Sequence, residues 1–137
     1  MGPGTAPQVG VSAVVPFFLE ADWPAPPGVR GGSTLRHGLG ASPPPFDALN
    51  LGGHRTPNGD AAMHVFANRT ALREALALPA DPLWLRQVHG TRVLDADAAG
   101  PTVAALGADG MTAFAVDEEP EADAAVTRRA GVVLAVL

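Results

Sequence analysis

Residues 84–90 read WLRQVHG, and the stretch from Leu83 to His89 alternates apolar and polar positions as a β-strand does. Alternate side chains of a strand point to opposite faces, so Gln87 and His89 are predicted to point the same way. Gly90 begins a tight turn that leads into residues 92–94 (RVL). The sequence therefore predicts a β-hairpin with His89 beside its bend.

Upstream of this stretch, the sequence predicts one helix from Asp60, as the N-cap, to about Leu78, because the next residue is a proline. Asn68 and Arg69 lie close to the apolar arc of this helix. Polar groups on the core side of a helix must be hydrogen-bonded or must face a cleft. Two interpretations therefore remain: these side chains tie down a neighbouring loop, or they contribute to a site. The apolar arc itself consists of Val65, Leu72 and Leu76, with Ala75 beside it.

The composition of the remaining segments predicts short strands and loops. Residues 11–19 are predicted to form a short edge strand with a proline-rich exit, and residues 31–45 (GGSTLRHGLGASPPP) to form a loop. Residues 95–120 are predicted to be a long surface insertion, within which residues 112–116 could form a short strand. We expect residues 1–22 to form an N-terminal segment and residues 23–137 to belong to a single domain.

Residues 132–137 (VVLAVL) form a continuous aliphatic run, which is typical of a strand buried on both faces. Chain termini usually lie exposed at the surface of a domain. A chain that ends inside such a run is therefore expected to be truncated at a core strand.

Composition excludes several classes of function. The net charge is −5, and the nine basic residues are scattered, which argues against a nucleic-acid or anionic membrane partner. The chain contains no cysteine, so it forms no disulfide and no thiolate metal site, and we expect a cytoplasmic location. Sixteen glycines and 14 prolines predict a loop-rich chain.

Four histidines are the side chains that combine metal affinity with a pKa near neutrality. None of them belongs to a strong local catalytic motif. A lone histidine at a strand end is more often structural than a ligand, so His89 by itself does not identify a site.

Four motifs taken in order are more informative. They are FDALNLGGH at residues 46–54, Asn68-Arg69, WLRQVHG at residues 84–90 and EADAAVT at residues 121–127, with a glycine and an aliphatic run after the last. From Trp23 to Leu137 this series resembles the laccase-domain or multicopper polyphenol oxidase family. Members of that family are also named purine nucleoside phosphorylases and peptidoglycan editing factors. The resemblance implies an α+β fold of layered α/β/β/α type.

The resemblance also implies chemistry. It makes His89 one of three metal ligands, the others being a Cys and a His of family segments that are absent from these 137 residues. It implies zinc, with copper as the alternative, and an incomplete metal site in this chain. Zinc suits phosphorolysis or deamination of purine nucleosides because it has no redox chemistry, whereas phenol oxidation would require copper. The implied partners are a purine nucleoside and phosphate, and we expect little or no activity from the chain alone.

Five further residues are candidates for contact with substrate. The family's Thr-Arg-x-Gly-Gly-Val-Ser loop corresponds here to residues 34–42 (TLRHGLGAS), which carry one additional residue between Thr and Arg. Hydrogen bonds that lock a loop explain Asn50 and Asp123 as well as a cleft role does. The five candidates are Arg36, His37, Asn50, Gln87 and Asp123.

Two alternatives to an enzyme remain at this point. The chain could be a non-catalytic fragment or binding module, or an α+β domain whose motif matches are coincidental.

Overall fold

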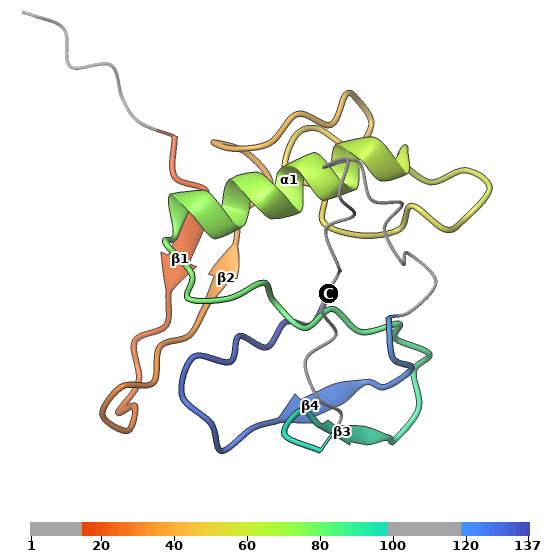
Figure 1. Cartoon of the computed structure of the whole chain (residues 1–137). Helices are drawn as coiled ribbons and strands as arrows, with labels where there is room; N and C mark the ends of the chain where they lie inside the picture. The colour runs from red at the N-terminus through yellow and green to blue at the C-terminus, as the bar shows by residue number, and fades with distance from the viewer. Residues whose placement is uncertain (1–14, 99–118) are drawn as a thin grey trace, which may run out of the picture.

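The computed structural model describes residues 15–98 and 119–137. In these residues β1 (Phe18–Glu20) pairs antiparallel with β2 (Gly32–Thr34), and β3 (Val93–Asp95) pairs parallel with β4 (Ala124–Val126). The helix α1 (Ala62–Ala75) crosses the molecule above the two small sheets (Figure 1). This part of the chain confirms the α+β class. Its one helix and two two-stranded sheets do not by themselves make four layers.

The pairing of β1 with β2 corrects the prediction that residues 31–45 are all loop. Thr34 lies opposite Phe18, and Gly32 lies opposite Glu20. A Cβ on Gly32 would overlap the ring of Phe18 and the carbonyl oxygen of Leu19. Glycine therefore lets the aromatic ring lie against the backbone of β2, a contact between distant residues that composition does not reveal.

The predicted helix is confirmed, but both of its ends differ. The N-cap is Ala61, whose methyl side chain cannot accept a capping hydrogen bond. The carboxylate of Asp60, the predicted N-cap, bonds the Ala61 backbone N–H and the side chains of Ser42, Asn50 and His64. At the other end Ala77 adopts a left-handed conformation with φ 49°. That conformation ends the helix before the proline does.

The buried face of α1 carries Asn68, whose side chain is fully buried. Its Oδ1 accepts the backbone N–H of Ala41 at 2.7 Å, and its Nδ2 donates to Ser42 Oγ at 2.8 Å and to the carbonyl oxygens of Ala48 and Asn50 at 3.2 and 2.8 Å. Asn68 therefore ties down the loop at residues 41–50, as one of the two interpretations predicts.

The predicted hairpin around His89 is wrong. Residues 83–89 form only isolated parallel bridges, from Leu83 to Leu134 and from Arg86 to Glu121, and residues 93–95 pair in parallel with β4. The backbone N–H groups at the bend donate to the carboxylate of Asp123, which lies in a distant segment, and not to an adjacent strand. Local alternation could not reveal that parallel partner, because parallel pairing always joins segments distant in sequence.

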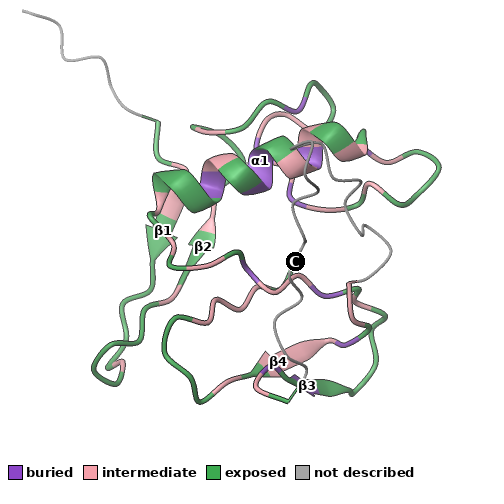
Figure 2. Ribbon diagram, in the orientation of Figure 1, coloured by how far each residue is buried: buried purple, intermediate pink, exposed green. Residues whose placement is uncertain are grey.

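Two small apolar clusters hold the described residues together. One contains Leu49, Leu51 and Leu72, with Trp84 packed against it, and the other contains Leu85, Leu94 and Ala122. Figure 2 shows buried positions along α1 and on the segments that face it, whereas the strands are largely half-buried or exposed.

Residues 132–137 do not form the doubly buried strand that was predicted. They make a single bridge through Leu134, and the side chains of Val136 and Leu137 are well exposed. Most of the predicted insertion and the predicted strand at residues 112–116 lie outside the described residues. Within the described part of the chain, no helix is long and apolar enough to cross a bilayer.

Candidate functional site

A cavity of about 240 Å³ lies where five stretches of the chain meet, the last of them being Leu137. Residues 52–55 contribute one wall, α1 contributes Arg69, and the extended segment at residues 85–89 contributes another wall. Glu119 completes the polar lining. The lining residues are Gly52, Gly53, His54, Arg55, Arg69, Leu85, Arg86, Gln87, His89, Glu119 and Leu137.

His89 lies on this cavity in a left-handed backbone conformation with φ 57°. The Asp123 carboxylate holds the bend by accepting three backbone N–H groups, from Val88 at 2.9 Å, His89 at 2.7 Å and Gly90 at 2.7 Å. The bond from Gly90 is the largest cause that lowers the pKa of Asp123. The carboxylate therefore stays charged at neutral pH and holds the His89 turn in a conformation that non-glycine residues seldom adopt.

Arg69 is the buried cation of the cavity. Its Nε donates to the Leu51 carbonyl oxygen at 2.9 Å, and its Nη1 donates to Glu119 Oε1 at 2.6 Å. The guanidinium also lies 4.1 Å from the centre of the Trp84 ring, which is a cation–π distance. Burial lowers the pKa of Arg69 while Glu119 raises it, and a guanidinium remains charged under these conditions.

His54 faces the same region with unsatisfied ring nitrogens. In the part of the chain that the structure describes, both ring nitrogens of His54 and the Nη2 of Arg69 are buried without a hydrogen-bond partner. Burial, followed by the charge of Arg69, lowers the pKa of His54. The imidazole is therefore neutral near pH 7 and offers one donor and one acceptor.

The structure brings only part of the predicted site together. Gln87 and His89 both line the cavity, and the Gln87 amide also donates to the Leu137 carbonyl oxygen at 3.2 Å. Asp123 supports the cavity from behind the turn, whereas Asn50 donates to the Asp60 carboxylate at 3.1 Å. The role of these residues in binding substrate stays a prediction.

Arg36 and His37 lie outside the lining of this cavity. The Arg36 guanidinium donates to the carbonyl oxygens of Asp47 and Pro45 at 2.5 and 2.6 Å, and pairs with the Asp47 carboxylate at 3.2 Å. Its hydrogen bonds therefore hold the loop of residues 45–47. His37 is exposed on the neighbouring loop.

The donor chemistry of the cavity fits part of a zinc shell. Imidazole and carboxylate are ordinary zinc ligands, and His54, His89 and Glu119 all line the cavity. Among the described residues, however, no three histidine or acidic side chains are gathered closely enough to hold a metal ion. This part of the chain presents donors without assembling a three-ligand set.

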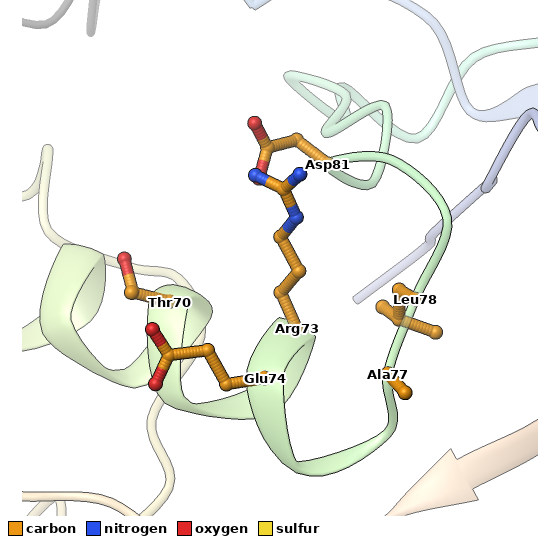
Figure 3. Close-up of a pocket in the computed structure, with 6 residues that line it drawn as sticks. All are labelled: Thr70, Arg73, Glu74, Ala77, Leu78 and Asp81. Atoms are coloured by element: carbon orange, nitrogen blue, oxygen red, sulfur yellow. The ribbon is translucent and has the colours of Figure 1, made fainter.

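A second hollow, of about 330 Å³, lies at the C-terminal end of α1. Figure 3 shows Arg73 and Asp81 reaching toward each other there, and their charged atoms are 2.9 Å apart. Both side chains are substantially exposed, so the pair neutralises itself at the surface. Thr70, Glu74, Ala77 and Leu78 complete the lining, which contains no histidine. The His89 cavity is the better candidate for chemistry.

Four polar residues of the cavity were not predicted from the sequence as site residues: His54, Arg55, Arg86 and Glu119. His54 ends the FDALNLGGH motif, and that position was the available signal for it. Arg55 and Glu119 carry no local signal. Their role depends on Arg69, which lies 50 residues before Glu119 in the chain.

Comparison with known proteins places the fold among solved relatives. The chain matches the crystal structure of a Neisseria meningitidis protein described by the family name DUF152, with a TM-score of 0.64 and 34% sequence identity, over 88% of this chain and 40% of that one. The identity and the coverage together show a shared fold over most of the chain.

The chain is also similar in sequence to curated proteins named purine nucleoside phosphorylase. The chain is 51% identical over 121 residues to a purine nucleoside phosphorylase of Xylella fastidiosa (strain 9a5c), covering 88% of this chain and 42% of that protein. It is 51% identical over 77 residues to a purine nucleoside phosphorylase of Escherichia coli (strain K12), covering 56% of this chain and 30% of that protein. The chain thus spans less than half the length of these relatives.

The model of the family described as multi-copper polyphenol oxidoreductase laccase matches residues 30–137. This range includes every residue that lines the cavity and the carboxylate that holds its histidine turn. The chain therefore belongs to the multi-copper polyphenol oxidoreductase laccase family.

Proposed function

We propose that this chain supplies one wall of the active site of a metal-dependent purine nucleoside phosphorylase, with adenosine deamination as a related activity. The observation that carries the proposal is the His89 turn, which Asp123 holds beside a cavity that contains Arg69 and His54. The curated relatives named purine nucleoside phosphorylase support the reaction class. A purine nucleoside and inorganic phosphate are the proposed substrates, in the cytoplasm.

His89 is the proposed metal ligand within this chain, with zinc favoured over copper. When bound, zinc would act as a Lewis acid that polarises a substrate oxygen or lowers the pKa of bound water. The family resemblance assigns the other two ligands to a Cys and a His that these residues do not include. The proposed complete domain has the α/β/β/α layers of that family.

The residues of this chain have separable tasks in the proposal. Asp123 is a positioning residue, because it touches the backbone of His89 rather than the cavity. Gln87 and Arg69 line the cavity and can orient polar groups of a substrate, and the charge of Arg69 favours an anion. Leu85, which is buried in an apolar cluster, gives the cavity an apolar wall.

A chimera tests the proposal. The region of the Xylella fastidiosa purine nucleoside phosphorylase that matches this chain would be replaced by this sequence. We expect phosphate-dependent release of purine base and ribose 1-phosphate, and a loss of at least about 100-fold on His89→Ala. A folded chimera that releases no base from any purine nucleoside would refute the proposal.

Controls separate the reaction from folding. Arg30→Gln removes an exposed cation that pairs with Glu20 outside the cavity lining, and should leave turnover unchanged. His37→Ala removes an exposed imidazole and should not lower the zinc content of the chimera, whereas His89→Ala should. The isolated 137 residues should show no turnover, because one imidazole does not hold zinc at useful affinity.

A non-catalytic binding role is the second candidate. It is favoured by the absence of a three-ligand group from the described part of the chain. A chimera that binds nucleosides but does not convert them would support it.

A further inference from the structure

Two guanidinium groups converge on one carboxylate in the lining of the cavity. Arg69 Nη1 is 2.6 Å from Glu119 Oε1, and Arg55 Nη2 is 3.4 Å from Glu119 Oε2. Each oxygen of the carboxylate thus faces a different cation. With two positive charges and one negative charge, this group retains a net positive charge in a partly desolvated place.

The same place has hydrogen-bonding capacity that this part of the chain does not use. Arg69 is nine-tenths buried, and its Nη2 has no hydrogen-bond partner among the described residues. Both ring nitrogens of His54 are also buried without a partner there. Buried polar atoms without partners are rare in native proteins, and an ion or ligand bound here would satisfy them.

Arg69 cannot turn away to find solvent. Its Nε is bonded to the Leu51 carbonyl oxygen, and its plane is packed over the ring of Trp84. The free Nη2 is therefore held in place before any ligand arrives, and such preorganisation strengthens binding.

The unsatisfied groups match a protonated oxyanion. Guanidinium groups bind phosphate through charge-assisted hydrogen bonds. Neutral His54 can donate one hydrogen bond to a phosphate oxygen and accept one from a phosphate hydroxyl, and phosphate carries at least one proton near neutral pH. The cavity, at about 240 Å³, is smaller than the usual site for a drug-sized ligand, so it suits a small anion better than a whole nucleoside.

We infer that Arg55, Arg69 and His54 form a binding site for inorganic phosphate, and that the Glu119 carboxylate occupies this site until phosphate displaces it. The inference deepens the proposed phosphorolysis and rests on it, since phosphate is the second substrate of that reaction. The competing interpretation is a purely structural ion pair. Under that interpretation Glu119 stays in place and phosphate has no specific effect.

Measuring phosphate binding to the full 137-residue chain discriminates between a phosphate site and a purely structural ion pair. Isothermal titration calorimetry with inorganic phosphate, at constant ionic strength set by chloride, would compare the wild type with Glu119→Gln and Arg55→Gln. We expect Glu119→Gln to bind phosphate about tenfold more tightly, because a competing charge is removed, and Arg55→Gln to bind it about tenfold more weakly.

Arg55 is the more useful cation to substitute, because its side chain is 27% exposed and the variant should fold, whereas Arg69 is integral to the core. Arg30→Gln, which removes a surface cation of the same charge, should bind phosphate as the wild type does. Thermal melting of each variant without phosphate confirms that the folds are equivalent.

Absence of phosphate binding by both the folded wild type and the folded Glu119→Gln variant would overturn the inference. Equal phosphate affinity in Arg55→Gln and the wild type would overturn it too. Phosphate binding with the expected order of affinities, in a chain whose chimera does not cleave nucleosides, would support this site and count against the proposed reaction.

Discussion

The Asp123 carboxylate accepts the backbone N–H of His89 at 2.7 Å across 34 residues of sequence. This bond, with those from Val88 and Gly90, determines the backbone conformation at the cavity. A carboxylate that receives three N–H groups replaces the strand partner that a hairpin would have provided. The histidine turn is therefore stabilised by a distant segment and not by its own neighbours.

Asp123→Asn should loosen this turn. The amide keeps the size of the side chain but has only one acceptor oxygen, so it cannot receive all three N–H groups. We expect hydrogen exchange at the amides of Val88, His89 and Gly90 to accelerate by on the order of tenfold, measured by NMR. Asp81→Asn, at an exposed surface pair, is the control. Unchanged exchange at these amides would show that Asp123 does not hold the turn.

Asp60 should make stability depend on pH in the acidic range. Burial by itself raises the pKa of Asp60, but hydrogen bonds from Ser42, His64, Asn50 and Ala61 together lower it from 3.8 to about 2. A lowered folded-state pKa stabilises the fold fully above the unfolded value, and this contribution disappears as the pH falls from 3.8 through about 2.

At neutral pH the contribution of Asp60 is about 2 kcal/mol. Asp60→Asn should reduce the free energy of unfolding in urea by this order and flatten its pH dependence below pH 3.8. Asp81→Asn, whose side chain is 70% exposed, should change neither. A variant at position 60 with the wild-type pH profile would contradict the assignment.

Asn68→Leu tests whether the hydrogen bonds of the Asn68 side chain stabilise the loop at residues 41–50. The substitution keeps the branched shape of the side chain but removes every hydrogen bond from residue 68 to the loop and leaves the N–H of Ala41 without its acceptor. We expect a loss of about 3 kcal/mol in the free energy of unfolding. Asn68→Asp, which keeps the acceptor and loses the donors, should behave as a destabilised variant with the Ala41 amide still protected from exchange. Wild-type stability of the Asn68→Leu variant would mean that the hydrogen bonds of Asn68 do not stabilise the loop.

A series of glycine substitutions separates backbone strain from steric overlap. Gly40 has φ 100°, and a Cβ there would overlap the Ala48 carbonyl oxygen, whereas Gly28 has φ 80° with open space around it. Gly31 has neither constraint. Alanine should cost about 3 kcal/mol at Gly40, about 1 kcal/mol at Gly28 and nothing at Gly31. Thermal melting of the three variants measures the order of these stability losses. Equal losses at Gly40 and Gly28 would show that the overlap with the Ala48 carbonyl oxygen adds no cost.

Local sequence was sufficient for the helix, the α+β class and the family. Apolar residues at helical spacing predict a helix whatever segment the helix packs against. Val65 and Leu72 of this arc are buried, as predicted. The WLRQVHG motif identified His89 as the residue of interest, and Gln87 and His89 both line the cavity, but so does Arg86, which strand alternation would place on the opposite face. The helix and each of the family motifs depend on residues that are close together in the sequence.

Tertiary structure alone decided which segments meet. The parallel pairing of β3 with β4, the support of His89 by Asp123, and the convergence of Arg55 and Arg69 on Glu119 all join residues far apart in sequence. Composition carries no information about such partners, because their energy comes from desolvated charges and hydrogen bonds that exist only once the chain has folded. The sequence determined the chemical groups of this protein, and folding determined which of them share a cavity.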